Sequence, residues 1–239
     1  MAQLKKQLGL FDVFAVAAGA MISSGLFVLP AIAFTKAGPA VVLSYLLASI
    51  LVLPSVLSKA ELSTAMPRAG GTYFFIERSL GTVLGLFSGF ASWFSLALKS
   101  AFAVVGMAIL IDVVLQMLFP AQIHPWHLKL IAVLCCMAFT MLNIVSVRHT
   151  SGFQILLVAV LLAILALFVI FGVRTVEVAR YEGFLQKGWP AILATAGLVF
   201  ISFGGLTKVA SIAEEVKHPG RNLPRGMFLA WFVVTLFYI

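Results

Sequence analysis

The chain has 239 residues, of which 62% are hydrophobic and only 10% are charged. Soluble globular domains carry about 25% charged residues, so this composition excludes a soluble domain and indicates a protein that crosses a membrane several times. The formal net charge of +8 does not indicate nucleic-acid binding, because the basic residues fall mostly in the short segments between apolar runs.

Six apolar stretches are long enough to cross a bilayer, since a spanning helix needs roughly 20 residues. A seventh begins near Met227 and reaches only Ile239. A stretch of about 13 residues is too short to span, so we expect the N-terminal part of a longer protein or a natural truncation. The six predicted spans are residues 11–34, 40–60, 82–111, 128–147, 152–173 and 189–213.

The loops between the spans indicate how the chain is oriented. With the N-terminus inside, nine Lys and Arg residues fall on the inner side and five on the outer side. An excess of these residues marks cytoplasmic loops. We therefore expect a multi-pass protein of the plasma (cell inner) membrane with a cytoplasmic N-terminus.

Two connections are longer than the others. Residues 62–81, on the inner side, are amphipathic, and Pro67 with Gly70 and Gly71 would bend them. Residues 174–188, on the outer side, carry alternating charges and fit either a solvated connector or a short surface helix.

Small residues interrupt two of the apolar segments near their middles, at residues 18–27 and 200–208. Backbone that leaves the helix at membrane depth must find new partners or line a cavity, because lipid offers no hydrogen bonds. A pair of such breaks in separate spans is the best sequence indication of a transporter's binding site. The alternative is that the small residues only permit close helix packing.

Three motifs occur in order along the chain: Gly19–Phe27 in the first span, Ala60–Tyr73 after the second, and Ala213–Arg225 after the sixth. Together they resemble the amino acid permeases of the amino acid–polyamine–organocation (APC) superfamily, over essentially the whole chain. The resemblance implies an all-α transmembrane fold like that of the LeuT transporters, with two inverted repeats of five helices and discontinuous helices 1 and 6. Residues 1–173 would form the first repeat. Residues 174–239 would hold the external linker, helix 6 and the start of helix 7, so the fold is truncated.

The two breaks would hold a substrate between them. N–H groups at an unwound segment attract an anion such as an amino acid carboxylate, and the carbonyls of the other break would accept hydrogen bonds from an ammonium group. Phe203 would gate the site or shape a side-chain pocket. The predicted substrate-binding residues are Ile22, Ser23, Ser24 and Gly25 in the first break and Ser202, Phe203, Gly204 and Gly205 in the second.

Two lysines lie within spans, where a charge costs roughly 2.5–3.5 kcal/mol on insertion scales. Lys99 would bind a carboxylate, hold a coupling proton or replace a metal ion. Lys208 either alters the choice of substrate or extends its ammonium group to the inner surface. Proton-coupled members of the family that the chain resembles often carry a lysine six residues after a helix 5 glutamine, but Val160 follows Gln154 here. The coupling ion, H⁺ or Na⁺, therefore stays undecided.

Other polar residues have simpler interpretations. Asp12 reads as a helix N-cap. His124, His127, His149 and His218 lie in or beside loops without zinc-site context, and Cys135 with Cys136 matches no metal spacing, so we expect neither a metal site nor a cofactor. A further group would form ion pairs of an inner gate or be solvated helix ends: Glu61, Arg68, Glu214 and Glu215.

The leading interpretation is a secondary active transporter of amino acids or related amines that works by alternating access. The chain has no Walker motif, so ATP would not be the direct energy source. An enzyme is not expected, because all four histidines lie at loop depth. The alternative is a non-transporting membrane scaffold or facilitator subunit, since the second repeat is incomplete. The expected partners are the small-molecule substrate and the lipid bilayer, without nucleic acid, and the oligomeric state is open.

Overall fold

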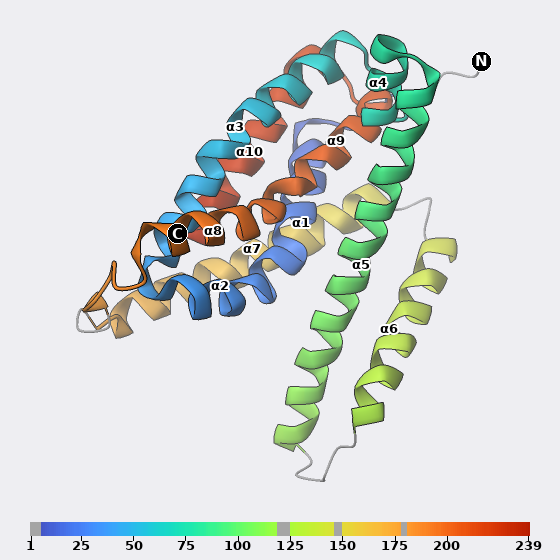
Figure 1. The fold of residues 1–239 in the computed structure, drawn as a ribbon. Coiled ribbons are helices and arrows are strands. Elements are labelled where there is room, and N and C mark those ends of the chain that lie inside the picture. Colours follow the sequence, from blue (N-terminus) through green and yellow to red (C-terminus); the bar gives the residue numbers. More distant parts are fainter. Residues whose placement is uncertain (1–5, 119–124, 146–149, 178–180) are drawn as a thin grey trace. The chain divides into compact units, whose positions relative to one another are not determined.

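The structure is a computed structural model that describes residues 6–118, 125–145, 150–177 and 181–239. Every regular element in these residues is a helix, and extended pairing there is limited to an isolated bridge between Leu8 and Val216. The all-α prediction is therefore confirmed for the described part of the chain. The helices form two compact units, Met1–Gly89 with Ser151–Ile239 and Phe90–Thr150 (Figure 1).

Most elements belong to the first unit, and the second unit contains the greater part of α5 (Thr82–Leu118) and all of α6 (Pro125–Val145). Short 3-10 helices, labelled η, connect several α-helices of the first unit. Its elements are α1 (Leu10–Phe27), α2 (Leu29–Ala37), η1 (Gly38–Ala40), α3 (Val41–Ala65), α4 (Thr72–Leu80), the start of α5, α7 (Thr150–Gly172), η2 (Val173–Thr175), α8 (Gly188–Val199), η4 (Phe200–Leu206), α9 (Thr207–Ser211), η5 (Ala213–Glu215) and α10 (Pro219–Tyr238).

α1 lies at the centre of the first unit and packs against α10 and η4, while α3 packs against α8 and α10. Small apolar residues dominate the buried face of α1, including Ala15, Ala17 and Ala18. Such residues let neighbouring helices approach closely, which is how helices associate where no hydrophobic force drives them together. The core of this unit is therefore built around the first apolar segment.

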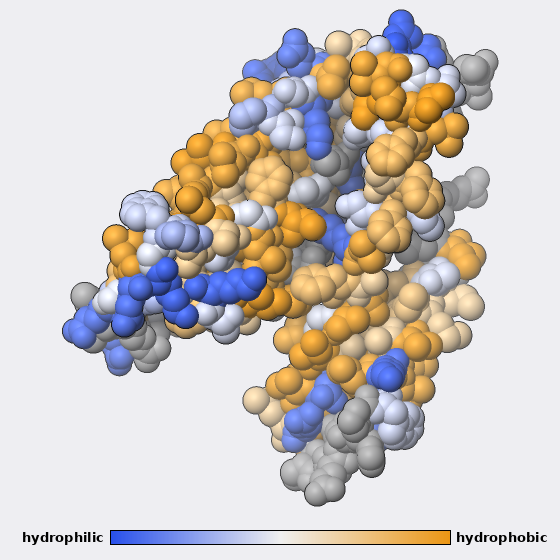
Figure 2. Space-filling view, viewed as in Figure 1, coloured by the Kyte–Doolittle hydropathy of each residue, from blue (hydrophilic) through white to orange (hydrophobic). Residues whose placement is uncertain are grey.

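Four helical stretches of the described residues are long and apolar enough to cross a membrane: Leu29–Ala65, Thr82–Leu118, Gln154–Gly172 and Gly188–Ser211. Two further apolar helices, Leu10–Ile22 and Trp126–Met141, are shorter. Hydrophobic residues cover much of the visible face in the space-filling view, and hydrophilic residues gather mainly at the ends of the first unit's helices (Figure 2). Length and composition therefore support a membrane protein.

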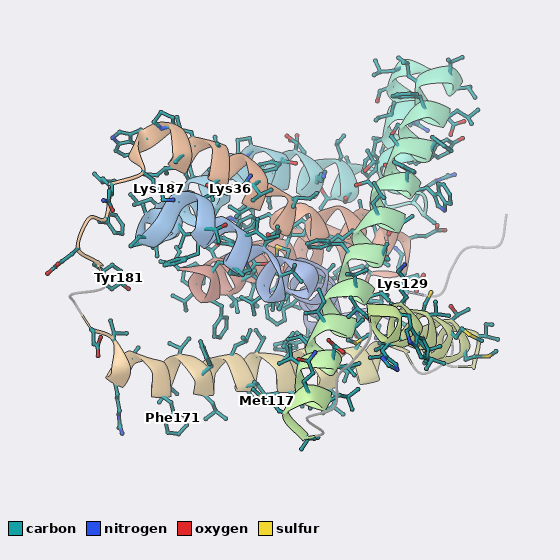
Figure 3. All side chains as sticks on the ribbon, turned by 60° about the horizontal axis from the view of Figure 1, so that its bottom comes forward. Lys36, Met117, Lys129, Phe171, Tyr181 and Lys187 are labelled. Carbon is teal, nitrogen blue, oxygen red and sulfur yellow. The ribbon has the colours of Figure 1, made fainter. Side chains whose placement is uncertain are left out.

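The boundary between the first two predicted spans differs from the expected one. We expected a break between residues 34 and 40, but α2 runs into α3 through η1 without an intervening loop. Gly38 makes this possible because its φ of 63° lies in the left-handed region that favours glycine. At the same end of the unit, Lys187 Nζ donates to the carbonyl of Thr35 at 3.2 Å, and Lys36 lies nearby (Figure 3).

Asp12 is not the N-cap that the sequence suggested. α1 begins at Leu10, so Gly9 occupies the cap position and Asp12 lies in the first turn. The Gly9 N–H donates to Asp12 Oδ2 at 2.8 Å. This is the backward half of a capping box, in which a first-turn carboxylate satisfies the N–H of the cap residue.

The seventh helix also begins earlier than expected. α10 starts at Pro219 rather than near Met227 and has 20 residues. Proline is well accepted in a first helical turn, where its missing N–H has no intrahelical partner to lose. The fully buried Leu223 packs in the core of the unit and stabilises the helical start that the polar sequence did not suggest.

The bend predicted for the inner connection is confirmed. α3 ends at Ala65, and Gly70 and Gly71 have φ angles of 115° and 54° before α4 begins. On α4, the Tyr73 side chain forms a hydrogen bond with Glu77, and this bond is the main cause of the raised pKa of Tyr73.

The outer connection contains η2 and turns over residues 182–187, with residues 178–180 outside the described part.

Candidate functional site

The second predicted break coincides with a change of helix type. α-helical geometry ends at Val199 and resumes at Thr207, and the seven residues between them form the 3-10 helix η4. A 3-10 helix bonds i to i+3 and has poorer hydrogen-bond geometry, so runs longer than three or four residues are uncommon. The chain stays helical here, but the segment singled out from the sequence is locally irregular.

The first break lies later than predicted. Ser23, Ser24 and Gly25 have α-helical backbone inside α1, and the interruption falls at Val28, before α2. Pro30 explains the position, because proline has no N–H to donate and its ring crowds the carbonyl four residues earlier. The sequence analysis did not use this proline. The side chains of Ser23 and Ser24 lie outside the described residues.

The structure nevertheless brings the two predicted segments together. Gly25 lies directly against η4, where a Cβ added to it would stand 2.8 Å from Ser202 Cβ and 2.9 Å from Ser202 Oγ. A side chain at Gly205 would overlap the backbone of Ala20 and Met21. Glycine at both positions therefore permits the contact between α1 and η4.

Two tyrosines that the sequence analysis missed complete this contact. Tyr238 OH donates to the Met21 carbonyl at 2.9 Å, and Tyr45 OH donates to the Gly25 carbonyl at 3.4 Å. The rings of Tyr45 and Tyr238 lie 5.0 Å apart between centroids. A signal was present in the sequence, because the chain has only four tyrosines and these two stand in apolar segments, where a phenol needs a partner.

Several hydroxyl groups of the first unit are buried. Thr195 Oγ1 and Thr235 Oγ1 make no hydrogen bond within the described residues. A buried polar group left unpaired costs about 1–3 kcal/mol. Ser202 lies beside Gly25, so its hydroxyl adds hydrogen-bonding capacity at the point where α1 meets η4.

The remaining second-break residues divide between two faces of η4. Phe203 is fully buried and its ring meets the Tyr238 ring edge-on at 5.4 Å, so it packs in the core and lines no open path in this structure. Gly205 faces α1. Gly204 is exposed, with no heavy atom within 4 Å of an added Cβ. Ile22, from the first break, is fully buried.

Glu214, one of the four residues assigned to an inner gate, contacts the loop between α3 and α4. Within the described residues, no ion pair joins Arg68 to Glu61, Glu214 or Glu215. Instead, the Ala69 N–H donates to Glu214 Oε2 at 2.9 Å.

The segment around Glu215 holds the N-terminal residues in a similar way. The Glu215 carbonyl accepts hydrogen bonds from the N–H groups of Gln7 and Leu8, at 2.8 and 3.0 Å. The Lys217 N–H donates to the Leu8 carbonyl at 2.8 Å. Residues 211–217, which we call the inner clasp, therefore contact both the N-terminal segment and the loop between α3 and α4.

The two membrane lysines lie in different units. Lys99 is half-buried on α5 in the second unit, whereas Lys208 is exposed on α9 in the first.

An apolar cleft of about 560 Å³ opens elsewhere in the first unit, between the C-terminal ends of α2 and α7. Phe34, Val42, Phe168 and Tyr181 are among its lining residues, and none of the predicted substrate-binding residues is. Within the described residues, no three His, Cys, Asp or Glu side chains form a metal-binding group. His124 and His149 lie outside that part of the chain.

The fold and the contact define a helical membrane protein whose first and sixth apolar segments meet in its core. The chain belongs to the amino acid permease family, because the family model for amino acid permeases matches residues 8–239. The recognition made from three sequence motifs is thereby confirmed, and the family is one of permeases rather than enzymes.

Individual relatives agree with the family model. The chain is 27% identical to the branched-chain amino acid permease BcaP of Bacillus subtilis and 27% identical to cationic amino acid transporter 1 of Arabidopsis thaliana. It is 29% identical to the mouse large neutral amino acids transporter small subunit 2. Each match covers 99% of this chain but only 53%, 41% and 46% of the respective relatives. The chain thus spans about half the length of these curated relatives.

Proposed function

We propose that the protein is a secondary active transporter of amino acids or related amines, which works by alternating access. The observation that carries the proposal is the contact around Gly25, where two segments far apart in the sequence meet within an apolar core. The relatives named as transporters of branched-chain, cationic and large neutral amino acids support the substrate class.

The substrate would be held between the end of α1 and η4. Its carboxylate would be bound by Ser23–Gly25 together with N–H groups of the first turn of α2, which has no side-chain cap. Its ammonium group would be bound by carbonyls of Ser202–Gly205 and by the Ser202 hydroxyl. Opening of α1 and η4 relative to each other would expose this site to one side of the membrane at a time.

The wider architecture is part of the same proposal. The two segments lie five spans apart, as two inverted five-helix repeats would place them. In that arrangement residues 1–173 form the first repeat, and residues 174–239 begin the second. We place the protein in the plasma membrane with a cytoplasmic N-terminus, coupled to either H⁺ or Na⁺.

Uptake into proteoliposomes tests the proposal. The protein would be purified at its natural length, reconstituted, and supplied with radiolabelled leucine, arginine or glutamate under H⁺, Na⁺ or no ion gradient. We expect saturable uptake of at least one amino acid that rises with one of the gradients. Uptake at a rate that does not depend on any of the gradients would indicate a facilitator. The absence of any uptake, with correctly folded protein, would favour a scaffold subunit.

A further inference from the structure

The last helix, α10, has one packed face and one open face. The side chains of the packed face are buried in the core of the first unit and recur every three or four residues: Leu223, Met227, Ala230 and Val234. The side chains of the open face are exposed and recur at the same spacing: Arg221, Arg225, Leu229, Phe232 and Leu236. Residues at this spacing lie on one face of an α-helix, so the five exposed side chains form a continuous stripe.

The open face of α10 changes from basic to apolar along its length. Arg221 and Arg225 lie in its first two turns, and the side chains of Leu229, Phe232 and Leu236 are 40%, 60% and 66% exposed. From Arg225 to Leu236 the helix rises about 16 Å, at 1.5 Å per residue. Half of a hydrocarbon core of about 30 Å is about 15 Å. The apolar part of the stripe therefore matches the depth of one leaflet, with the two arginines at the level of its headgroups.

The neighbouring helix supports this placement. α3 and α10 run antiparallel, because the inner clasp joins the loop after α3 to the segment before α10, and Trp231 Nε1 donates to the Ser49 carbonyl at 3.0 Å further along both helices (Figure 1). α3 belongs to the stretch Leu29–Ala65, which is long and apolar enough to cross a membrane. Ten positions separate Trp231 from Arg221 and Ser49 from Lys59, so a third cation lies near the level of Arg221.

The two guanidinium groups have no anionic partner in the described part of the chain. Neither the Arg221 nor the Arg225 side chain forms a hydrogen bond or an ion pair there, and α10 itself contains no Asp or Glu. Guanidinium groups bind phosphate oxygens in a bidentate geometry. In the proposed orientation these arginines lie on the cytoplasmic side, where the leaflet is rich in anionic lipids.

We infer that the open face of α10 binds an anionic phospholipid of the inner leaflet. Its phosphate would lie on Arg221 and Arg225, and an acyl chain would run along Leu229, Phe232 and Leu236. The choice of leaflet rests on the proposed orientation, but the binding does not depend on transport. A protein surface on this face would bury two guanidinium groups to which α10 offers no countercharge, which is costly.

The first test is native mass spectrometry of the purified protein, at its natural length, titrated with phosphatidylglycerol or phosphatidylcholine. We expect the wild type to prefer phosphatidylglycerol. In the Arg221→Gln/Arg225→Gln variant its affinity should fall on the order of thirtyfold, because each basic residue near an anionic surface contributes a factor of about five. Lys36→Gln/Arg174→Gln, which removes two exposed cations elsewhere in the first unit, should bind like the wild type.

Equal affinity of the wild type for the two lipids would overturn the inference, and so would an equal loss in the two double variants. If the arginine double variant is not monodisperse, Arg225→Gln alone replaces it, with an expected loss of about fivefold.

The second test identifies what covers the apolar part of the stripe. A benzophenone amino acid replaces Phe232, and the protein is irradiated in nanodiscs with equal amounts of the two lipids. We expect adducts mainly with phosphatidylglycerol, and no such preference once Arg221 and Arg225 are replaced by glutamine. Cross-linking to a peptide of the same chain or of a second copy would overturn the inference, because protein would then cover this face. Neither test measures transport, so these negative results would leave the transport proposal standing.

Discussion

Gly25 has little free space around it, since Ser202 and Tyr238 both lie within 3 Å of where its Cβ would be. The position therefore requires close packing of α1 on η4. A methyl group added here would force α1 and η4 apart.

We expect Gly25→Ala to lower the initial rate of amino acid uptake at least tenfold and to reduce stability by about 1–3 kcal/mol, because overpacking displaces the contact. Gly197→Ala is the matched control, since no heavy atom lies within 4 Å of its added Cβ. The measurements are uptake per amount of reconstituted protein and thermal unfolding in detergent. Equal uptake in the two variants would contradict the proposed site.

Tyr238 tests the polar part of the same contact. Tyr238→Phe keeps the ring that packs against Phe203 and Tyr45 but leaves the Met21 carbonyl without its donor. We expect a loss of about 1 kcal/mol, which lowers the unfolding temperature by about 2–4 °C. Tyr181→Phe, at an exposed position of the outer connection, should leave this temperature unchanged. A Tyr238→Phe protein as stable as the wild type would show that the hydrogen bond contributes nothing.

At the scale of elements, the inner clasp joins three parts of the chain that are distant in sequence. It accepts hydrogen bonds from Gln7 and Leu8 through the carbonyl of Glu215, and from the Ala69 N–H through the side chain of Glu214. Any movement of the inner clasp away from the N-terminal segment or from the loop between α3 and α4 must therefore break these bonds.

Loss of the Glu214 carboxylate should release the loop between α3 and α4. In Glu214→Ala we expect amide hydrogen exchange at Ala69 and Gly70 to increase about fivefold, which corresponds to about 1 kcal/mol for one exposed hydrogen bond. Glu61→Ala is the control, because the Glu61 side chain makes no hydrogen bond within the described residues. Equal exchange in the two variants would show that the loop is held without Glu214.

The elements also show which local signals the sequence carries. Small residues at 200–205 predicted an irregular segment, and η4 lies there. The same reasoning placed the first interruption at Ser23–Gly25, but it falls at Val28. Small residues permit either a break or a close contact, whereas Pro30 removes a hydrogen bond outright, so the proline decides.

At the scale of the whole molecule, the Lys and Arg distribution predicts a cytoplasmic N-terminus. After replacement of Cys135 and Cys136 by serine, we expect Lys187→Cys to react with a membrane-impermeant maleimide on intact cells. Lys217→Cys should react only after permeabilisation. Both positions are exposed, so access to the reagent depends on the side of the membrane. The opposite labelling pattern would reverse the orientation.

The sequence by itself determined the membrane class, the helical content and the family. Apolar runs of spanning length and a low charge content are enough for the first two, because the bilayer admits few other structures. Three motifs were enough for the family, which the match over residues 8–239 confirms. The candidate segments around Gly25 and Ser202 also came from the sequence, since small residues in apolar runs are visible without a structure.

Only the tertiary structure decided how these segments meet. The hydrogen bonds of Tyr238 to Met21 and of Tyr45 to Gly25 link residues far apart or in different helices, and no local pattern encodes them. The start of α10 at Pro219 depends likewise on the burial of Leu223 in the core. The local sequence determines which backbone conformation a segment prefers. Burial against another helix determines whether the segment adopts that conformation in the folded protein.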